Sequence, residues 1–178
     1  DITAASLITL TASANITGAG GVDDRLDLAA GSQVDASSTT AGEISLRGLG
    51  DITLTDVDTV DGLIDVEAAG AITATDVSSG GGAGDSVTLN STAAGDITVG
   101  SITSADTVTL TNSDGSIVDS ADDATVDITA ASLITLTASA NITGAGGVDG
   151  RLDLAAGSQV DASSTCLLYT SDAADEWL

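Results

Sequence analysis

The chain carries one long internal copy. Residues 127–165 repeat residues 1–39 with 38 of 39 identities, and the single difference places Gly150 where the first copy has Asp24. The two copies lie 126 residues apart. So long and so close a copy indicates either the tandem duplication of a whole module or the misassembly of repetitive reads. Duplication predicts a repeat architecture, in which each unit packs mainly against its neighbours.

A shorter and less regular period lies inside this module. Pairs of apolar residues separated by one polar residue recur at steps of 18 to 26 residues, with a mean of 21 across the module. A further apolar residue follows eight to ten positions after the first member of each pair. This alternation is typical of half-buried strands, and Thr, Ile and Val favour a pleated surface. The pairs are Ile8/Leu10, Leu26/Leu28, Ile44/Leu46, Ile64/Val66, Val87/Leu89, Val108/Leu110, Ile134/Leu136 and Leu152/Leu154.

Two all-β architectures fit this pattern. In a parallel β-helix, a solenoid with coils of roughly 18–26 residues, the eight pairs would stack as one internal ladder. Looser third positions would follow at Val57, Val77 and Ile102. The alternative is a set of β-sandwich repeat modules, which normally use large aromatic anchors in the core. Because residues 1–165 contain no aromatic residue, we predict that they form a parallel β-helix.

The last thirteen residues differ from the rest. Cys166, Tyr169 and Trp177 are the single Cys, Tyr and Trp of the chain. The stretch "CLLYTSDAADE" is similar to the in-frame translation of a sequencing adapter, so we expect 166–178 to be a non-native, unstructured tail and exclude it from the fold prediction. A natural tail would instead make Tyr169 and Trp177 a cap or docking peptide. With no initiator Met and no signal peptide, we expect an internal fragment of a longer protein.

The charge of the chain restricts its partners. There are 27 Asp and Glu against three Arg and no Lys, a formal net charge of −24. Binding to nucleic acid or to anionic membrane surfaces needs clustered Lys and Arg, so neither partner is expected. No apolar run approaches the roughly 18 residues that a membrane-spanning helix requires, so no such segment is expected either.

The residues for catalysis are scarce. Without His or Lys, and with Cys only in the tail, the chain lacks the usual base for a Ser nucleophile and the usual zinc ligands. The adjacent carboxylates of Asp122 and Asp123 could in principle act on a glycoside, but a solvated turn explains them more simply. We therefore predict no enzyme and assign no catalytic, cofactor-binding or metal-ligating residue.

Calcium is the one metal ion whose binding remains compatible with this composition. Residues 80–88, "GGGAGDSVT", nearly match the Ca²⁺-binding nonapeptide, with Asp85 in place and Ala83 where Gly is required. Residues 56–62, "DVDTVDG", are similar to the start of an EF-hand, but Val60 stands at a ligand position and the distal Glu is missing. A structural Ca²⁺ therefore stays an alternative to Asp placed in turns and on outer faces.

Several phrases carry a family resemblance. "GDITLTDVDTVDG", "AGAITATDV" and "AAGDITVGSITSADTVTLTNSDGSI" resemble the coils of large bacterial surface proteins of the filamentous-haemagglutinin type, over nearly all of 1–165. The resemblance implies a right-handed parallel β-helix and a structural shaft segment of a secreted, adhesin-like protein at the bacterial cell surface. Any host or cell-surface ligand would then be bound by regions outside 1–165. The alternative function is a Ca²⁺-binding repeat module that folds on export.

Overall fold

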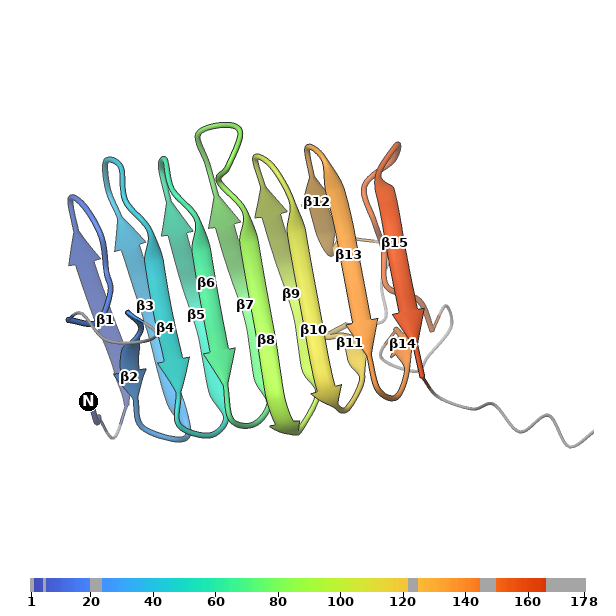
Figure 1. Ribbon diagram of the computed structural model, residues 1–178, viewed down its shortest axis with the longest axis horizontal. Coiled ribbons are helices and arrows are strands. Elements are labelled where there is room, and N and C mark those ends of the chain that lie inside the picture. Colours follow the sequence, from blue (N-terminus) through green and yellow to red (C-terminus); the bar gives the residue numbers. More distant parts are fainter. Residues whose placement is uncertain (1, 5, 20–23, 122–124, 145–149, 166–178) are drawn as a thin grey trace, which may run out of the picture.

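The computed structural model describes residues 2–4, 6–19, 24–121, 125–144 and 150–165. These residues form an all-β parallel solenoid of about six turns, without a helix (Figure 1). The prediction of a parallel β-helix is confirmed. The tail at 166–178 and the Asp122–Asp123 pair lie outside the described residues.

Two parallel sheets form the long sides of the solenoid. The seven-stranded sheet, called here the front wall, faces the viewer in Figure 1, and the eight-stranded rear wall lies behind it. The front wall consists of β2 (Leu26–Leu28), β4 (Ile44–Gly48), β6 (Ile64–Ala68), β8 (Val87–Ala94), β10 (Val108–Asp114), β13 (Leu133–Ala138) and β15 (Gln159–Ser164). The rear wall consists of β1 (Leu7–Ala12), β3 (Ser32–Ser38), β5 (Ile52–Thr59), β7 (Ile72–Ser79), β9 (Ile97–Ser104), β11 (Ile117–Asp119) and β14 (Ile142–Thr143), with β12 (Ile128–Ala130) beside β9.

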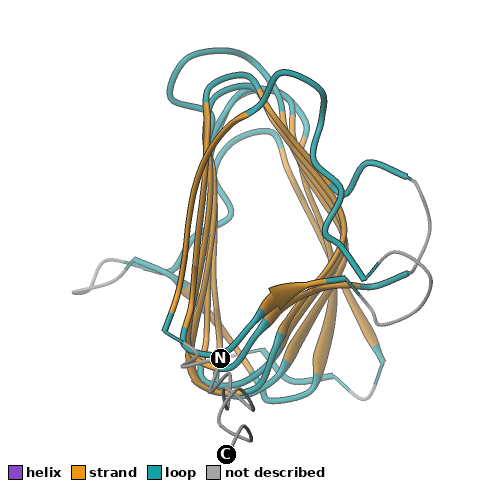
Figure 2. Cartoon of the chain, turned by 90° about the vertical axis from the view of Figure 1, so that its right-hand side faces the viewer, coloured by secondary structure: helices purple, strands orange, loops and turns teal. Residues whose placement is uncertain are grey.

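The register of the ladders gives the length of each coil. Residues that face each other on neighbouring coils are 20 positions apart at Ile44 and Ile64, and 26 apart at Val108 and Ile134. Viewed along the solenoid, the coils superpose into a roughly triangular outline with strands on its two long sides (Figure 2). Every named strand pair is parallel, which distinguishes this fold from the sandwich alternative.

Aliphatic side chains fill the space between the walls. In the central strands the inward residues alternate with outward ones, and the inward set is almost fully buried. Burial of such side chains contributes about 1.5–3 kcal/mol each relative to exposure, which makes the stacked rows the main stabilising element. The largest of them are Leu28, Ile44, Leu46, Ile52, Leu54, Ile64, Ile72, Leu89, Ile97, Ile102, Leu110 and Ile117.

A ladder of buried hydroxyl groups lines one corner. Ser38, Thr59, Ser79 and Ser104 occupy equivalent positions in successive rear-wall strands. Their hydroxyls donate to carbonyl oxygens of the turns, as in the 2.6 Å bond from Ser79 Oγ to the carbonyl of Asp85. A buried carbonyl oxygen without a hydrogen-bond partner costs free energy. The hydroxyl ladder supplies these partners, so the turn carbonyls can point into the interior.

The long rear-wall strands bend in the middle. In β5 the residues Thr55 and Asp56 both face outward, so that Leu54 and Val57 both face inward on either side of the bend. The register shift against β3 falls at the same place, as expected for a bulge. The third apolar positions predicted from the sequence therefore belong to the same strands as the second ones.

The prediction of a single ladder of eight pairs is wrong at both ends. Six pairs lie in the front wall, but Ile8/Leu10 belongs to β1 in the rear wall. At the other end Leu154 bridges Ile128 of β12, which is also in the rear wall. The 18-residue steps next to these two pairs carry the chain across to the opposite wall, whereas the 18-residue step from Leu26 to Ile44 stays in the front wall, where Leu26 pairs with Leu46.

The two copies of the duplicated segment consequently lie in opposite walls. The strands β1 and β13 have the same sequence, and each pairs in the same register, Leu7 with Gln33 and Leu133 with Gln159. Five steps along the rear wall lead from β1 to β11, and β13 follows half a coil later in the front wall. The 126-residue module therefore spans five and a half coils, although the apolar pairs recur in six steps over the same length.

Candidate functional site

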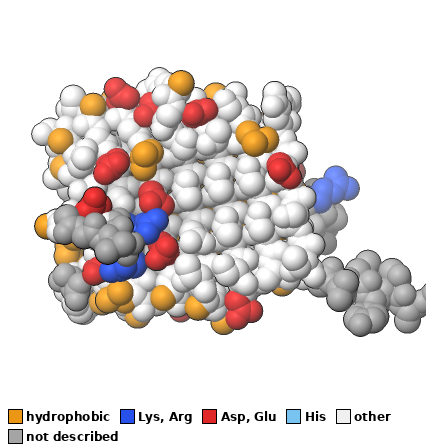
Figure 3. All heavy atoms as spheres, in the orientation of Figure 1, with side chains coloured by type: hydrophobic (Ala, Val, Ile, Leu, Met, Phe, Trp, Pro, Cys, Tyr) orange, Lys and Arg blue, Asp and Glu red, His pale blue; other side chains and the backbone are white. Residues whose placement is uncertain are grey.

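The outer face of the front wall divides into two halves (Figure 3). Charged side chains gather over β2, β4 and β6, whereas hydroxyl and amide side chains form even rows over β8, β10 and β13. The charged half is called here the arginine cluster and comprises Arg25, Asp27, Arg47, Asp65 and Glu67. The uncharged half is called the hydroxyl face and comprises Thr88, Asn90, Thr109, Thr111, Thr135 and Thr137.

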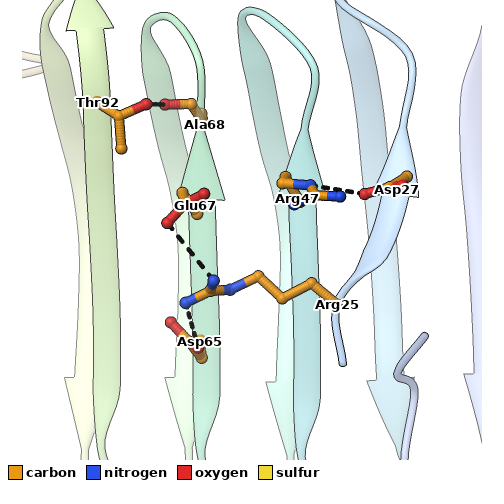
Figure 4. Close-up of polar contacts among 7 residues, drawn as sticks. All are labelled: Arg25, Asp27, Arg47, Asp65, Glu67, Ala68 and Thr92. Carbon is orange, nitrogen blue, oxygen red and sulfur yellow. Dashed lines mark hydrogen bonds and ion pairs between the residues drawn. The ribbon is translucent and has the colours of Figure 1, made fainter. Parts of the chain in front are cut away.

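The arginine cluster connects coils to one another (Figure 4). Arg47 Nε donates to Asp27 Oδ1 on the neighbouring coil at 2.7 Å. Arg25 reaches two coils along, where Nη2 lies 2.8 Å from Asp65 Oδ2 and Nη1 lies 3.4 Å from Glu67 Oε2. The hydrogen bond from Arg47 lowers the pKa of the Asp27 carboxyl. Because these guanidinium groups already contact carboxylates of the chain, the cluster stabilises the stack and is not laid out as an anion-binding site.

The hydroxyl face is flat and carries no charge. Thr109 lies opposite Thr88 on one side and Thr135 on the other, at the spacing of about 4.8 Å between parallel strands. An open groove of about 340 Å³ borders this face near Thr111 and Thr137. Its lining has no acidic, basic or aromatic side chain among the described residues, so it offers no acid–base chemistry.

The rear wall instead carries a row of carboxylates. Asp35 lies opposite Asp56, and Asp76 and Asp58 lie close to them on the same outer face. Burial raises the pKa of Asp56, and the like charges of Asp58, Asp76 and Asp35 raise it further. Ser37 Oγ donates to Asp58 Oδ2 at 3.0 Å. Within the described part of the chain, no group of three or more acidic, His or Cys side chains is arranged to hold a metal ion.

The two calcium-like segments have ordinary structural positions. In 80–88 the Asp85 carboxylate accepts a hydrogen bond from the backbone N–H of Gly82, and Gly84 N–H donates to Asp106 at 2.8 Å. The segment 56–62 begins as the second half of strand β5, not as a ligand loop. Asp61 of one segment and Asp85 of the other both lie beside Gly81, but within the described residues no third acidic side chain joins them to form a group that could hold a metal ion.

Aspartate side chains also bridge coils at the turns, which the sequence patterns did not reveal. Asp51 Oδ1 accepts the N–H of Ala71 at 2.9 Å, and Asp96 Oδ1 accepts the N–H of Ser116 at 2.8 Å. Both Asp residues occur in the phrase "GDIT", and the repetition of this phrase was the sequence signal that could have indicated the bridges. Part of the excess of Asp is therefore used to satisfy backbone donors of the following coil.

A pair of buried carboxyl groups, also missed by sequence reasoning, closes the base of the loop between β11 and β12. Asp119 and Asp127 are only 4% and 5% exposed. Asp127 Oδ2 accepts the N–H of Asp153 at 2.7 Å, while Asp119 Oδ1 accepts the N–H of Ala121 at 2.9 Å. Burial raises the pKa of Asp127 to about 6, and the nearby carboxyl of Asp119 adds to the shift. The Asp127 carboxyl, with its pKa raised to about 6, therefore makes the base of this loop sensitive to pH.

The fold defines a class: a parallel β-solenoid of about six turns with a filled aliphatic interior. Comparison with protein families, with curated proteins and with solved structures finds no match to this chain. Within the described residues, no helix is long and apolar enough to cross a membrane. The architecture itself is compatible with a structural shaft.

Proposed function

We propose that this protein is a length of structural shaft in a secreted, adhesin-like protein of the bacterial cell surface. In this role the stacked coils hold a binding region at a distance from its anchor, and the ligand is bound outside 1–165. The family resemblance of the coil sequences supports the location and the adhesin class. The absence of His and Lys supports a non-catalytic role.

One observation carries the proposal. Both walls continue without interruption from one coil to the next, and the inward side chains form rows that run the length of the molecule. Each coil therefore satisfies its backbone groups on the coils before and after it, and length is added by repeating the same contacts. The arginine cluster and the Asp bridges at the turns reinforce this axial connection.

The length of engineered arrays tests the shaft. Small-angle scattering and electron microscopy of chains with one, two and three further copies of the module should show a rod that lengthens by about 26 Å for each copy, from five and a half coils at about 4.8 Å. Flexible beads on a string, or a length that does not grow linearly, would contradict a stiff shaft.

Circular dichroism distinguishes the structural shaft from the alternative, a Ca²⁺-binding repeat module. A shaft built from hydrophobic rows should show its full strand signal in excess chelator, with an unchanged melting temperature when Ca²⁺ is added. A repeat module that folds on export would gain strand signal only with Ca²⁺. Fractionation of cells that express the complete gene, with antibody detection of this segment, tests whether the protein reaches the surface.

A further inference from the structure

The duplication provides an internal comparison of one strand in two environments. The strands β3 and β15 share the sequence "QVDASS", and each pairs on one side with the same sequence in the same register. On its other side β3 is covered by β5, whereas β15 is the last strand of the front wall among the residues that the structure describes. Val34 in β3 is 0% exposed, and its counterpart Val160 is 45% exposed. The difference in exposure between Val34 and Val160 shows how much of this strand is covered by a following coil.

The segment that covers β3 is known from the first copy. It comprises β4 and β5, and it places Leu54 opposite Val34 and Val57 opposite Ala36. On the opposite wall β4 pairs with β2, with Leu46 opposite Leu26. The equivalent of β2 in the second copy, 152–154, forms only an isolated bridge through Leu154. Within the described part of the chain, the end coil therefore lacks the same neighbour in both walls.

The positions of charged side chains also indicate that a further copy of this covering segment fits the end coil. In the first copy Arg47 of the covering segment donates to Asp27, and the equivalent of Asp27 in the second copy is Asp153. A further copy of the covering segment would bring an Arg to Asp153 on a strongly acidic chain. A foreign strand would have to supply both the apolar pattern and this cation.

We propose that the coil edge formed by β15 and 152–154 is a docking surface for the segment 40–59, "TAGEISLRGLGDITLTDVDT", of a further copy of this module. Leu54 of the docked segment packs on Val160, Val57 packs on Ala162, and Arg47 pairs with Asp153. Main-chain hydrogen bonds provide affinity and the inward side chains set the register, as in strand addition to an exposed sheet edge. The proposal rests on the shaft function in supposing that further modules exist.

A synthetic peptide with the sequence of 40–59 tests the surface on the full chain. A fluorescent label on its N-terminus should give saturable binding by anisotropy, and hydrogen exchange should slow in 150–165. Val160→Asp in the protein should weaken binding by roughly tenfold or more, because it places a charge under the docked strand. Leu49→Asp, at a residue that is also about half exposed, is the matched control and should bind as the unaltered chain does.

Two peptide variants sharpen the result. Leu54→Asp in the peptide should abolish binding, and Arg47→Gln should weaken it and reduce its dependence on salt. Absence of saturable binding, equal binding by the Val160→Asp protein, or exchange protection confined to β1 would each overturn the proposal. If binding fails while the strand signal and melting temperature of the chain stay normal, the docking surface is refuted and the shaft function is unaffected.

Discussion

At the scale of single residues, the interior accepts only uncharged side chains that fit between two walls. Leu46 is fully buried between Leu26 and Val66 on the neighbouring coils. We expect Leu46→Asp to lower the free energy of unfolding by at least about 3 kcal/mol, since it removes apolar burial and introduces an unpaired charge. Leu49→Asp, at a half-exposed position, should change it by no more than about 0.5 kcal/mol. Chemical denaturation monitored by circular dichroism measures both, and similar values would contradict the assigned burial.

The buried pair at Asp119 and Asp127 predicts a dependence on pH. The pKa of Asp127 is raised from 3.8 to about 6, so the stability it provides is fully present below 3.8 and is lost as the pH rises through about 6. Asp127→Asn keeps an oxygen acceptor for the Asp153 N–H and adds a donor toward Asp119. We expect this variant to melt a few degrees higher at pH 7 and to lose most of the extra stability between pH 4 and 6.

The control for this prediction is Asp161→Asn, which removes the same charge from an exposed position of β15. Melting curves from pH 4 to 8 compare the three proteins. If both variants stabilise the protein equally at pH 7, relief of the overall negative charge explains the effect and the buried pair does not.

At the scale of elements, glycine turns allow the coils to approach one another. Gly62 has φ +155°, and a Cβ there would clash with the carbonyl oxygen of Gly42 in the preceding coil. We expect Gly62→Ala to destabilise the protein by more than about 1 kcal/mol, since the atom it would meet is backbone. Gly82→Ala has open space around the added methyl and should be nearly neutral in the same melting experiment. Equal effects would show that the turns can separate.

Strands could be predicted from the sequence, but their walls could not. The alternation in "ITL" and "VTL" specifies a strand with one buried side, and this pattern is the same whichever wall receives it. The sequence "LITLTA" illustrates the point, because one copy lies in the rear wall and the other in the front wall. Wall assignment depends on how far the chain has travelled around the coil, which is set by loops of unequal length. The buried Asp pair and the Asp bridges also arise only from this three-dimensional stacking.

At the scale of the whole molecule, the solenoid is held together mainly by contacts between neighbouring coils. Hydrogen bonds, hydrophobic rows, ion pairs and Asp bridges connect each coil to the next, and Arg25 extends this to the second coil along. Stability in such a molecule accumulates with the number of coils, and the ends are its weakest parts. We expect hydrogen exchange to be slowest in β6 to β9 and fastest in the coils at either end. Uniform protection from β1 to β15 would contradict this nearest-neighbour description.

The half coil at the end of each module also determines which side of a long array each module presents to solvent and to partners. A module of six coils would repeat every feature on one side, so that a filament would have a single decorated flank. With five and a half coils, each successive module is turned to the opposite side. An antibody against the arginine cluster would therefore label such a filament alternately on its two flanks, and any partner that recognises this surface could join two filaments lying side by side.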